Sequence, residues 1–216
     1  GVTPDGEINL EEISSFIKEN TALVSMLYVN NEIGTISDVE AVAAICKRNN
    51  IALHSDLTQA LGKTEIDVKK MGIDYASCSA HKIYGPKGIG ATFMKSDAYG
   101  IAPITAFMHG GEQEFGFRAG THAVHNIVGF GKAAEIALRD LKKNEAYIKS
   151  LDDMLIAGIS TIDGIHTTVD ISKRLPGIVS LVVDKMNFHN ERFIKKISEE
   201  VALSTGSAAI RASRIS

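Results

Sequence analysis

The chain has 216 residues, of which 44% are hydrophobic and 23% are charged, and this is the composition of a globular protein with a core. Its formal net charge of −3 gives no electrostatic reason to expect a nucleic acid or an anionic membrane as partner. Two cysteines do not indicate a disulfide framework or a cysteine metal site, and no histidine pair has helical metal-motif spacing, so we expect no metal. Without a membrane-spanning apolar run or a signal-peptide pattern, the expected compartment is the cytoplasm.

Helical and strand patterns alternate over residues 9–94. Asn9 can cap a helix whose apolar residues recur at helical spacing, and Asp38 can cap a second helix that runs to about Asn49. This alternation predicts an α/β fold with a mostly parallel sheet and helical crossovers. The expected strands cover residues 22–29, 51–55, 74–78 and 89–94. The first of them is nearly continuous in apolar residues, as are strands of parallel sheets that are buried on both faces, so we expect it to be buried.

The second half of the chain predicts a long helix and then a smaller α+β region. The helical pattern runs from about His122, with some break, to Ile162. We place a domain boundary near Lys142, which gives a large domain at 1–141 and a small domain at 142–216. The shorter elements expected in the small domain are a strand at 177–183, a helix at 191–199 and a strand at 201–204.

Polar side chains gather at the predicted carboxyl ends of the strands, which is where parallel sheets bind ligands. A lone lysine at such a place is usually a surface lysine whose stem covers apolar groups. Lys82, however, is accompanied by other polar residues, so we expect it to have a function. At the end of an apolar strand it would be desolvated among apolar neighbours, which lowers the pKa of a lysine. Such a lysine can form a Schiff base with a carbonyl cofactor such as pyridoxal phosphate. The gathered residues are Asn31, Asp56, Gln59 and Ser79 to Lys82.

A pyridoxal cofactor needs a carboxylate opposite its pyridine nitrogen, and Asp56 fits this role. Taken alone, Asp56 could equally be a strand-end cap or one half of an ion pair. Gln59 could bind the ring hydroxyl or be an ordinary exposed glutamine, while Ser79 and His81 could donate to a phosphate or be satisfied core groups. The glycine-rich run from residue 85 to 90 precedes a strand rather than a helix, so the dinucleotide-binding fingerprint is absent.

Four motifs follow one another along the chain: Asn30 to Gly34, His54 to Ala60, Ser79 to Gly88, and Met108 to Thr121. Together they resemble the cysteine desulfurases, the NifS/IscS-like branch of the class V aminotransferase group. The resemblance runs from about residue 1 to Ala208. It implies the type I, aspartate-aminotransferase-like fold of pyridoxal-phosphate enzymes. Residues 1–141 would then be the second part of the cofactor-binding large domain, and residues 142–216 part of the small domain.

The resemblance also implies a role for each matching residue. Lys82 would hold the cofactor and move protons at the substrate α-carbon, with His81 beside it as a second catalytic residue. Asp56 would pair with the pyridine nitrogen and Gln59 with the ring hydroxyl. Because family dimers contribute a threonine to the neighbouring phosphate site, Thr121 implies a homodimer. The further cofactor contacts would come from Asn31, Ser79, Ala80 and His81, with Asn31 also near the substrate carboxylate.

Two departures from the family pattern bear on activity. The family's first part carries a histidine that stacks on the cofactor and a turn that grips its phosphate, and this chain begins after them, so we interpret it as partial. Ala209 stands where the family has its persulfide-forming cysteine, directly after a matching run from Ser204 to Ala208. A methyl group cannot attack sulfur as a thiolate does. Cys46 and Cys78 are expected to be buried core residues rather than replacements.

The resemblance implies a cysteine desulfurase that converts L-cysteine to L-alanine and passes sulfur to an acceptor or scaffold protein for iron–sulfur cluster or tRNA thiolation pathways. Because of Ala209, we expect little or no turnover from this chain. Two alternatives stay open. One is another class V enzyme, such as a selenocysteine lyase, that does not rely on the cysteine. The other is a non-catalytic remnant or scaffold half that binds a complementary chain through an unpaired sheet edge.

Overall fold

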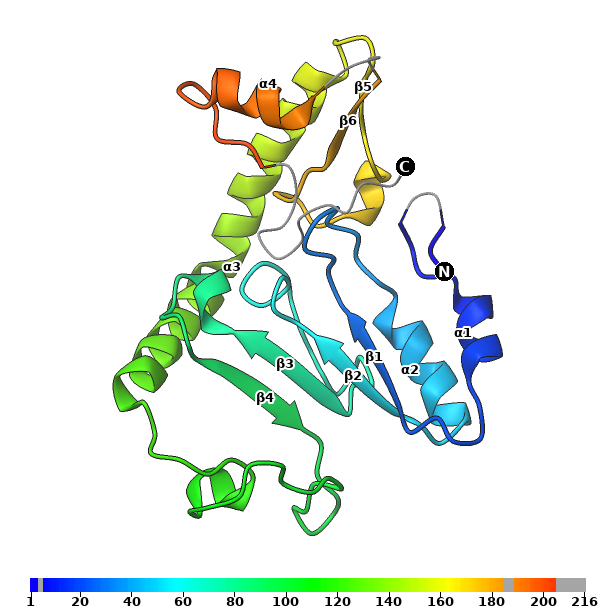
Figure 1. Ribbon diagram of the computed structural model, residues 1–216, viewed down its shortest axis with the longest axis vertical. Helices are drawn as coiled ribbons and strands as arrows, with labels where there is room; N and C mark the ends of the chain where they lie inside the picture. The colour runs from blue at the N-terminus through cyan, green and yellow to red at the C-terminus, as the bar shows by residue number, and fades with distance from the viewer. Residues whose placement is uncertain (4–5, 185–188, 205–216) are drawn as a thin grey trace. The chain divides into compact units, whose positions relative to one another are not determined.

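The computed structural model describes residues 1–3, 6–184 and 189–204, and the fold is drawn in Figure 1. These residues form two compact units. The four-stranded unit comprises residues 9–29 and 37–145, and the two-stranded unit comprises residues 1–8, 30–36 and the chain from Ala146 onward.

The four-stranded unit is built on one mixed sheet, whose strands lie side by side in the order β1-β2-β3-β4 (Figure 1). The first three strands are parallel, and the fourth runs antiparallel to β3. The mostly parallel sheet predicted from the alternating pattern is therefore confirmed. The strands are β1 (Leu23–Leu27), β2 (Ala52–Asp56), β3 (Tyr75–Ser79) and β4 (Gly90–Met94).

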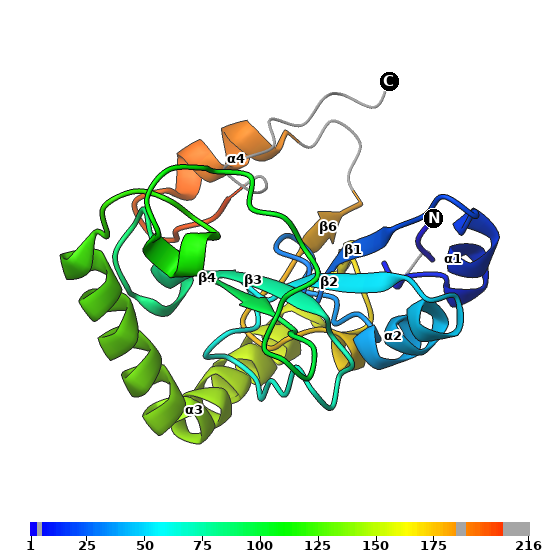
Figure 2. The same ribbon diagram turned by 90° about the horizontal axis from the view of Figure 1, so that it is seen from below.

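Two capped helices, α1 (Leu10–Phe16) and α2 (Val39–Arg48), belong to this unit. Asn9 Oδ1 accepts from two backbone N–H groups of the first turn of α1, and Asp38 Oδ1 accepts from Ala41 N at 2.9 Å. Both predicted caps are confirmed, and each satisfies donors that a helix start leaves free. Figure 2 shows α2 beside β2, and the core between helix and sheet consists of Val39, Val42, Cys46, Ile51, Leu53, Leu57, Met71, Ile73 and Ala76.

The other face of β1 is open within the described part of this unit. Leu23 is 48% exposed and Leu27 is 38% exposed, while the alternate residues Val24 and Met26 pack against the core. The expectation of a strand buried on both faces is wrong here, because α2 and its core cover one face only.

Helix α3 runs without interruption from Val124 to Ile159. The predicted break is wrong. The polar run from Lys142 to Glu145 interrupts the hydrophobic pattern, but lysine and glutamate are good helix formers and no proline intervenes. Along α3 the two units divide between Glu145 and Ala146. The assignment of a large and a small domain stays a prediction.

The two-stranded unit contains an antiparallel pair, β5 (Ile165–Thr167) with β6 (Leu181–Val183), and a short helix, α4 (Asn190–Ile197). The predicted helix at 191–199 is thus found one residue early, and the strand at 177–183 is reduced to its last three residues. Residues 201–204 form no strand, so that prediction is wrong. None of the helices in the described part of the chain is long and apolar enough to cross a membrane.

Candidate functional site

Lys82 lies on a single 3-10 turn, η1 (Ala80–Ile83), directly after β3. Ala80 and Ile83 are buried, whereas His81 and Lys82 are exposed. Ala80 N donates to the backbone oxygen of Ile89 at 3.1 Å, which joins the start of the turn to the residue before β4. The two apolar residues therefore anchor the turn, and the two cationic or titratable ones face outward.

Two glycines let this loop close tightly. A Cβ at position 85 would lie 2.9 Å from the Ala80 Cβ and 3.0 Å from the Ala80 oxygen. A Cβ at position 90 would lie 2.4 Å from the backbone oxygen of Cys78. Gly85 and Gly90 are thus required by the close approach of neighbouring atoms.

A row of small residues on α3 supports the loop that carries Lys82. Gly129, Ala133 and Ala137 are spaced four residues apart and so lie on one helix face. A Cβ at Gly129 would meet Pro86 Cγ at 2.6 Å, and a Cβ at Gly85 would lie 3.3 Å from the Ala133 Cβ. Larger side chains in this row would push the Lys82 loop away from α3.

The same row reaches the turn after β2. A Cβ at Gly62 would lie 2.9 Å from the Ala137 Cβ and 2.8 Å from Cγ2 of Ile83, the last residue of the Lys82 turn. Gly62 also has a φ of +70°, which favours glycine. The segment that carries Gln59 and the turn that carries Lys82 are therefore packed directly against each other.

Asp56 is the last residue of β2 and is paired in register with Ser77 of the parallel strand β3, two residues before Ser79. Its Oδ1 accepts from Thr58 N at 2.8 Å, which turns the chain back toward Gln59. The carboxyl ends of β2 and β3 thus bring Asp56, Gln59 and the run from Ser79 to Lys82 to the same edge of one sheet, as the sequence pattern predicts.

Asn31 belongs to the two-stranded unit, where it is exposed on the loop 30–36. Asn30 Oδ1 shapes this loop by accepting from the backbone N–H groups of Glu32 and Ile33 at 2.8 and 3.0 Å. Ile36 N donates to Lys173 O and Leu175 N donates to Gly34 O, both at 2.9 Å. The loop is therefore tied to the backbone on either side of Arg174.

Arg174 is itself fixed by a buried ion pair. Its two terminal nitrogens donate to Asp152 Oδ1 and Oδ2 at 2.8 and 2.6 Å, and the two side chains are 1% and 3% exposed. Asp152 Oδ1 also accepts from Gly177 N at 2.9 Å. Asp152 on α3 thus holds the backbone segment to which the Asn31 loop is attached.

Thr121 is exposed, just before α3. The segment that precedes it is folded on itself: Gly120 N donates to Gln113 Oε1 at 3.1 Å, and His122 Nε2 lies 3.1 Å from Glu114 Oε1. Two large apolar side chains of this segment are solvent-exposed: Phe107 is 94% exposed and Phe115 is 99% exposed.

The expectation that Lys82 is desolvated is wrong. The sequence pattern predicted a lysine desolvated among apolar neighbours, but the side chain is exposed. The physical reason is its place on η1, where only the first and last residues of the turn face inward.

The two cysteines have the properties of structural residues. Cys46 is 1% exposed, as expected, and burial raises the pKa of its thiol, with the Asp74 carboxylate adding to the effect. Cys78 is only half-buried, and there too burial is the largest cause of a raised pKa. Reactive cysteines have lowered thiol pKa values, so neither residue has the character of a sulfur nucleophile.

Two residues that sequence reasoning passed over lie beside the predicted ones. His54 hydrogen-bonds Ser25 Oγ through Nδ1 at 2.8 Å and Ser77 Oγ through Nε2 at 3.1 Å, which links β1, β2 and β3 across one sheet face. The alternation of β2 was the available signal, because it places His54 and Asp56 on the same face. The second missed residue is Lys63.

Lys63 lies one helical spacing beyond Gln59, and its Nζ donates to Gln59 Oε1 at 2.8 Å. Burial, followed by the positive charge of Lys82, lowers the pKa of Lys63. The i, i+4 spacing of an amide and a lysine was its only sequence signal.

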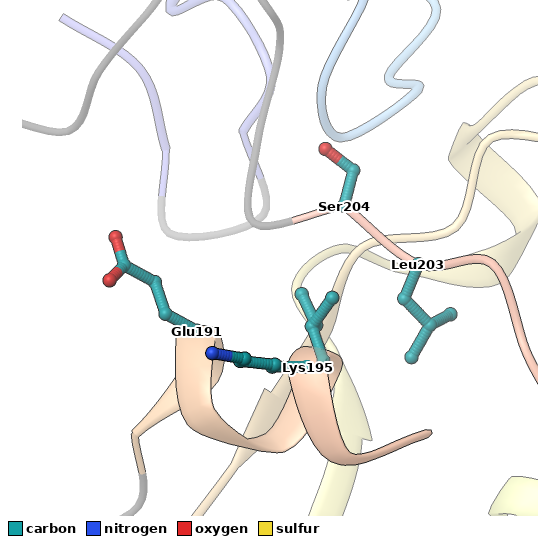
Figure 3. A pocket seen from close by; sticks show the side chains of 5 residues that line it. Glu191, Lys195, Leu203 and Ser204 are labelled. Atoms are coloured by element: carbon teal, nitrogen blue, oxygen red, sulfur yellow. The ribbon is translucent and has the colours of Figure 1, made fainter. Parts of the chain in front are cut away.

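A separate depression of about 380 Å³ lies in the two-stranded unit (Figure 3). Glu191 and Lys195 project from α4, and Leu203 and Ser204 come from the segment after it. None of the predicted site residues lines it. The remainder of the predicted cysteine-position motif, from Thr205 to Ala209, lies outside the described residues. Within the described ranges, no group of three or more histidine, cysteine, aspartate or glutamate residues could hold a metal ion.

Comparison with known proteins shows which family the chain belongs to. Residues 1–214 match the model of the family described as Aminotransferase class-V. The chain belongs to this family. The cysteine desulfurase IscS of Neisseria meningitidis serogroup C is 39% identical over 213 residues, which is 99% of this chain and 52% of that protein. The chain therefore spans about half the length of the curated relatives it matches.

Solved structures agree. A NifS-like protein is similar with a TM-score of 0.82 and 36% identity over 92% of this chain and 53% of that one. SspA in complex with cysteine gives a TM-score of 0.74 and 29% identity over 96% of this chain and 56% of that one. The sheet with its covering helices is the type I fold of pyridoxal-phosphate enzymes, and both the fold and the predicted family are confirmed.

Enzymes of this family depend on pyridoxal phosphate, as the sequence predicts. The residues of the four-stranded unit fit that group chemically. Lys82 offers an exposed primary amine, Asp56 a carboxylate at the neighbouring strand end, and Gln59 a side-chain amide on the adjoining turn. An aldehyde, a ring nitrogen and a ring oxygen each find a suitable partner in this set.

Proposed function

We propose that this chain is the lysine-bearing part of a pyridoxal-phosphate-dependent cysteine desulfurase, which acts on L-cysteine, releases L-alanine and hands sulfur to an acceptor protein. One observation carries the proposal: Lys82 lies on the turn η1, which directly follows β3, and Asp56 ends the parallel neighbour β2, so both stand at one sheet edge. The likeness to IscS proteins supports the choice of reaction within the family.

In this proposal the cofactor, when bound, supplies an electron sink for the substrate α-carbon. Lys82 provides the amine that binds the cofactor covalently and then moves a proton at that carbon, with His81 beside it. Asp56 keeps the ring nitrogen protonated through its negative charge. Gln59 binds the ring oxygen. Ser79 and His81 bind the phosphate, and Ala80 between them is a further cofactor contact. Thr121 is contributed to the phosphate site of a neighbouring subunit.

The resemblance to the cysteine desulfurases is the ground on which we also assign Asn31 to the cofactor and the substrate carboxylate. The backbone of Asn31 is supported by the attachment of the loop 30–36 to the segment that the Asp152–Arg174 pair holds. SspA, which is similar to this chain, was solved in complex with cysteine, and this favours cysteine as the substrate.

A matched set of lysine variants tests the assignment of Lys82. The protein is mixed with pyridoxal phosphate, reduced with borohydride and mapped by peptide mass spectrometry. We expect the reduced adduct on Lys82, its loss in Lys82→Ala and its retention in Lys87→Ala, because Lys87 is an exposed lysine of the same loop. An adduct spread over many lysines, or none, would contradict the proposal.

The sulfur-accepting step has no evident residue in this chain. Ala209 has no nucleophile, and the raised thiol pKa values of Cys46 and Cys78 argue against their replacing it. We therefore propose that the chain has little or no desulfurase turnover. Alanine or sulfide production above that of Lys82→Ala would show this to be wrong.

We also propose a cytoplasmic homodimer. The exposed side chains of Phe107 and Phe115 support a partner surface on the segment that ends at Thr121, because large apolar side chains are seldom gathered in water without a partner. Sedimentation of the protein with and without cofactor measures the oligomeric state, and a monomer under both conditions would contradict the dimer.

A second candidate is a non-catalytic half that binds a complementary chain. The exposed Leu23 and Leu27 favour it, because β1 pairs with β2 on one side and leaves its other edge and one face open within the described unit. The borohydride experiment separates the two: a specific adduct on Lys82 favours the enzyme, and its absence favours the binding half.

A further inference from the structure

Lys63 contacts the side-chain amide of Gln59 and thereby determines which hydrogen bonds that amide can still make. Its Nζ lies 2.8 Å from Gln59 Oε1, and both residues are half-buried. A lysine ammonium carries three donors and no acceptor, so the amide atom that it contacts must be the carbonyl oxygen. The direction of the Gln59 amide is thereby fixed by chemistry.

With the carbonyl oxygen engaged, the rest of the Gln59 amide is its NH2 group. That group carries two donors and no acceptor. A glutamine held in this way presents a donor, and a hydrogen bond from that donor to an anionic oxygen is stronger than one to a neutral hydroxyl. The contact with Lys63 therefore favours the anionic form of an oxygen that Gln59 binds through its nitrogen.

Lys63 is also held at a defined place relative to Lys82. Gly62 packs against Ile83 of the Lys82 turn and against Ala137 of α3, so the residue after it has little freedom to move away. The influence of the Lys82 charge on Lys63 supports this closeness. The positive charge of Lys63, which contacts the Gln59 amide, also favours the anionic form of an oxygen that the amide binds.

We propose that Lys63 is a positioning residue that fixes Gln59 as a hydrogen-bond donor, so that the site takes the cofactor's ring oxygen in its anionic form. This inference rests on the proposed function, because it assigns Gln59 to the ring oxygen of pyridoxal phosphate. It adds a residue that touches neither the cofactor nor the substrate and acts through Gln59.

Two ligands that differ by one oxygen test the proposal: pyridoxal phosphate and 3-deoxypyridoxal phosphate. Equilibrium dissociation constants are measured by titration for the wild type, Lys63→Met and Lys63→Arg. We expect Lys63→Met to weaken the binding of pyridoxal phosphate about tenfold and to leave the binding of the deoxy analogue unchanged. The reason is that the variant loses the hydrogen bond from the charged Lys63 that fixes Gln59 as a donor to the ring oxygen. Lys63→Arg keeps a donor and a charge, so it should restore most of the affinity.

Lys69→Met is the matched control, because Lys69 is an exposed lysine of the following turn outside the site. It should bind both ligands as the wild type does. An equal loss for both ligands in Lys63→Met would show a merely structural role, and no loss for either would show no role; each result overturns the inference. If the wild type itself fails to attach pyridoxal phosphate at Lys82, the proposed function fails and not this step alone.

Discussion

Gly62 and Ile83 meet where the turn after β2 packs against the turn that carries Lys82. A Cβ at Gly62 would lie 2.8 Å from Ile83 Cγ2, and the Gly62 backbone has a φ of +70°. Both facts make this position one that only glycine fills without strain. This close approach holds the turn with Gln59 and Lys63 against the turn with Lys82.

Gly62→Ala should therefore destabilise the protein. We expect the free energy of unfolding to fall by about 2 kcal/mol, since an added Cβ meets both a left-handed backbone and a filled space. Gly131→Ala is the control: it lies inside α3, and its Cβ would meet nothing within 4 Å. That change should raise the free energy of unfolding by about 0.5–1 kcal/mol. Urea denaturation measures both, and equal stability of the two variants would contradict the packing argument.

The Asp152–Arg174 pair leads to a second stability prediction. Asp152→Asn keeps the size of the side chain but leaves Arg174 buried without its counter-charge, so unfolding should become easier by about 3–5 kcal/mol. Asp153→Asn is the control, because the Lys149–Asp153 pair is more than half exposed and such pairs contribute about 0.5 kcal/mol or less. A similar small effect for both variants would show that the buried pair does not anchor the loop 30–36.

The same pair predicts an acid-dependent stability. Burial alone would raise the pKa of Asp152, but hydrogen bonds from Arg174 and from Gly177 N outweigh it, so the pKa lies below its usual value. The unfolded state then binds more protons, and the stabilisation is present above the unfolded pKa of about 3.9 and lost as the pH falls through the folded value. The stability difference between wild type and Asp152→Asn should therefore shrink below about pH 4. A difference that is constant from neutral pH to pH 3 would contradict it.

Local sequence signals were enough for the elements with capping residues and clear periodicity. Asn9 and Asp38 marked the starts of α1 and α2, and the polar residues at strand ends marked the sheet edge at which both Asp56 and Lys82 lie. Those signals are local, and the structure keeps them because the sheet places successive strand ends side by side.

Other features depended on contacts between distant segments. The exposure of Lys82 follows from which residues of η1 face inward. The hydrogen bond between Lys63 and Gln59 depends on the conformations of their two side chains. Residues 201–204 form no strand, because a short apolar run does not by itself determine strand pairing. The predicted break in α3 fails because helix propensity carried the chain through a polar stretch.

Thiol chemistry gives a fourth prediction. Because burial raises the pKa of both Cys46 and Cys78, each thiol should be mostly protonated at neutral pH and should react with iodoacetamide more slowly than free cysteine. Cys46, which is 1% exposed, should be the slower of the two in the folded protein, and both should react at the free rate in denaturant. Alkylation of either faster than free cysteine would identify a sulfur nucleophile that the structure does not lead us to expect.

The small-residue row on α3 gives the last prediction. Ala133 lies where a Cβ on Gly85 would be 3.3 Å from its own, so Ala133→Leu must displace the loop that closes the Lys82 turn. We expect the yield of borohydride-reduced adduct at Lys82 to fall by about tenfold, since small misplacements of a reacting group are costly. Gly131→Leu adds the same side chain to the same helix where the space is open. It should keep the adduct yield of the wild type, and an equal fall in both variants would mean that α3 stability, and not the position of Lys82, sets the yield.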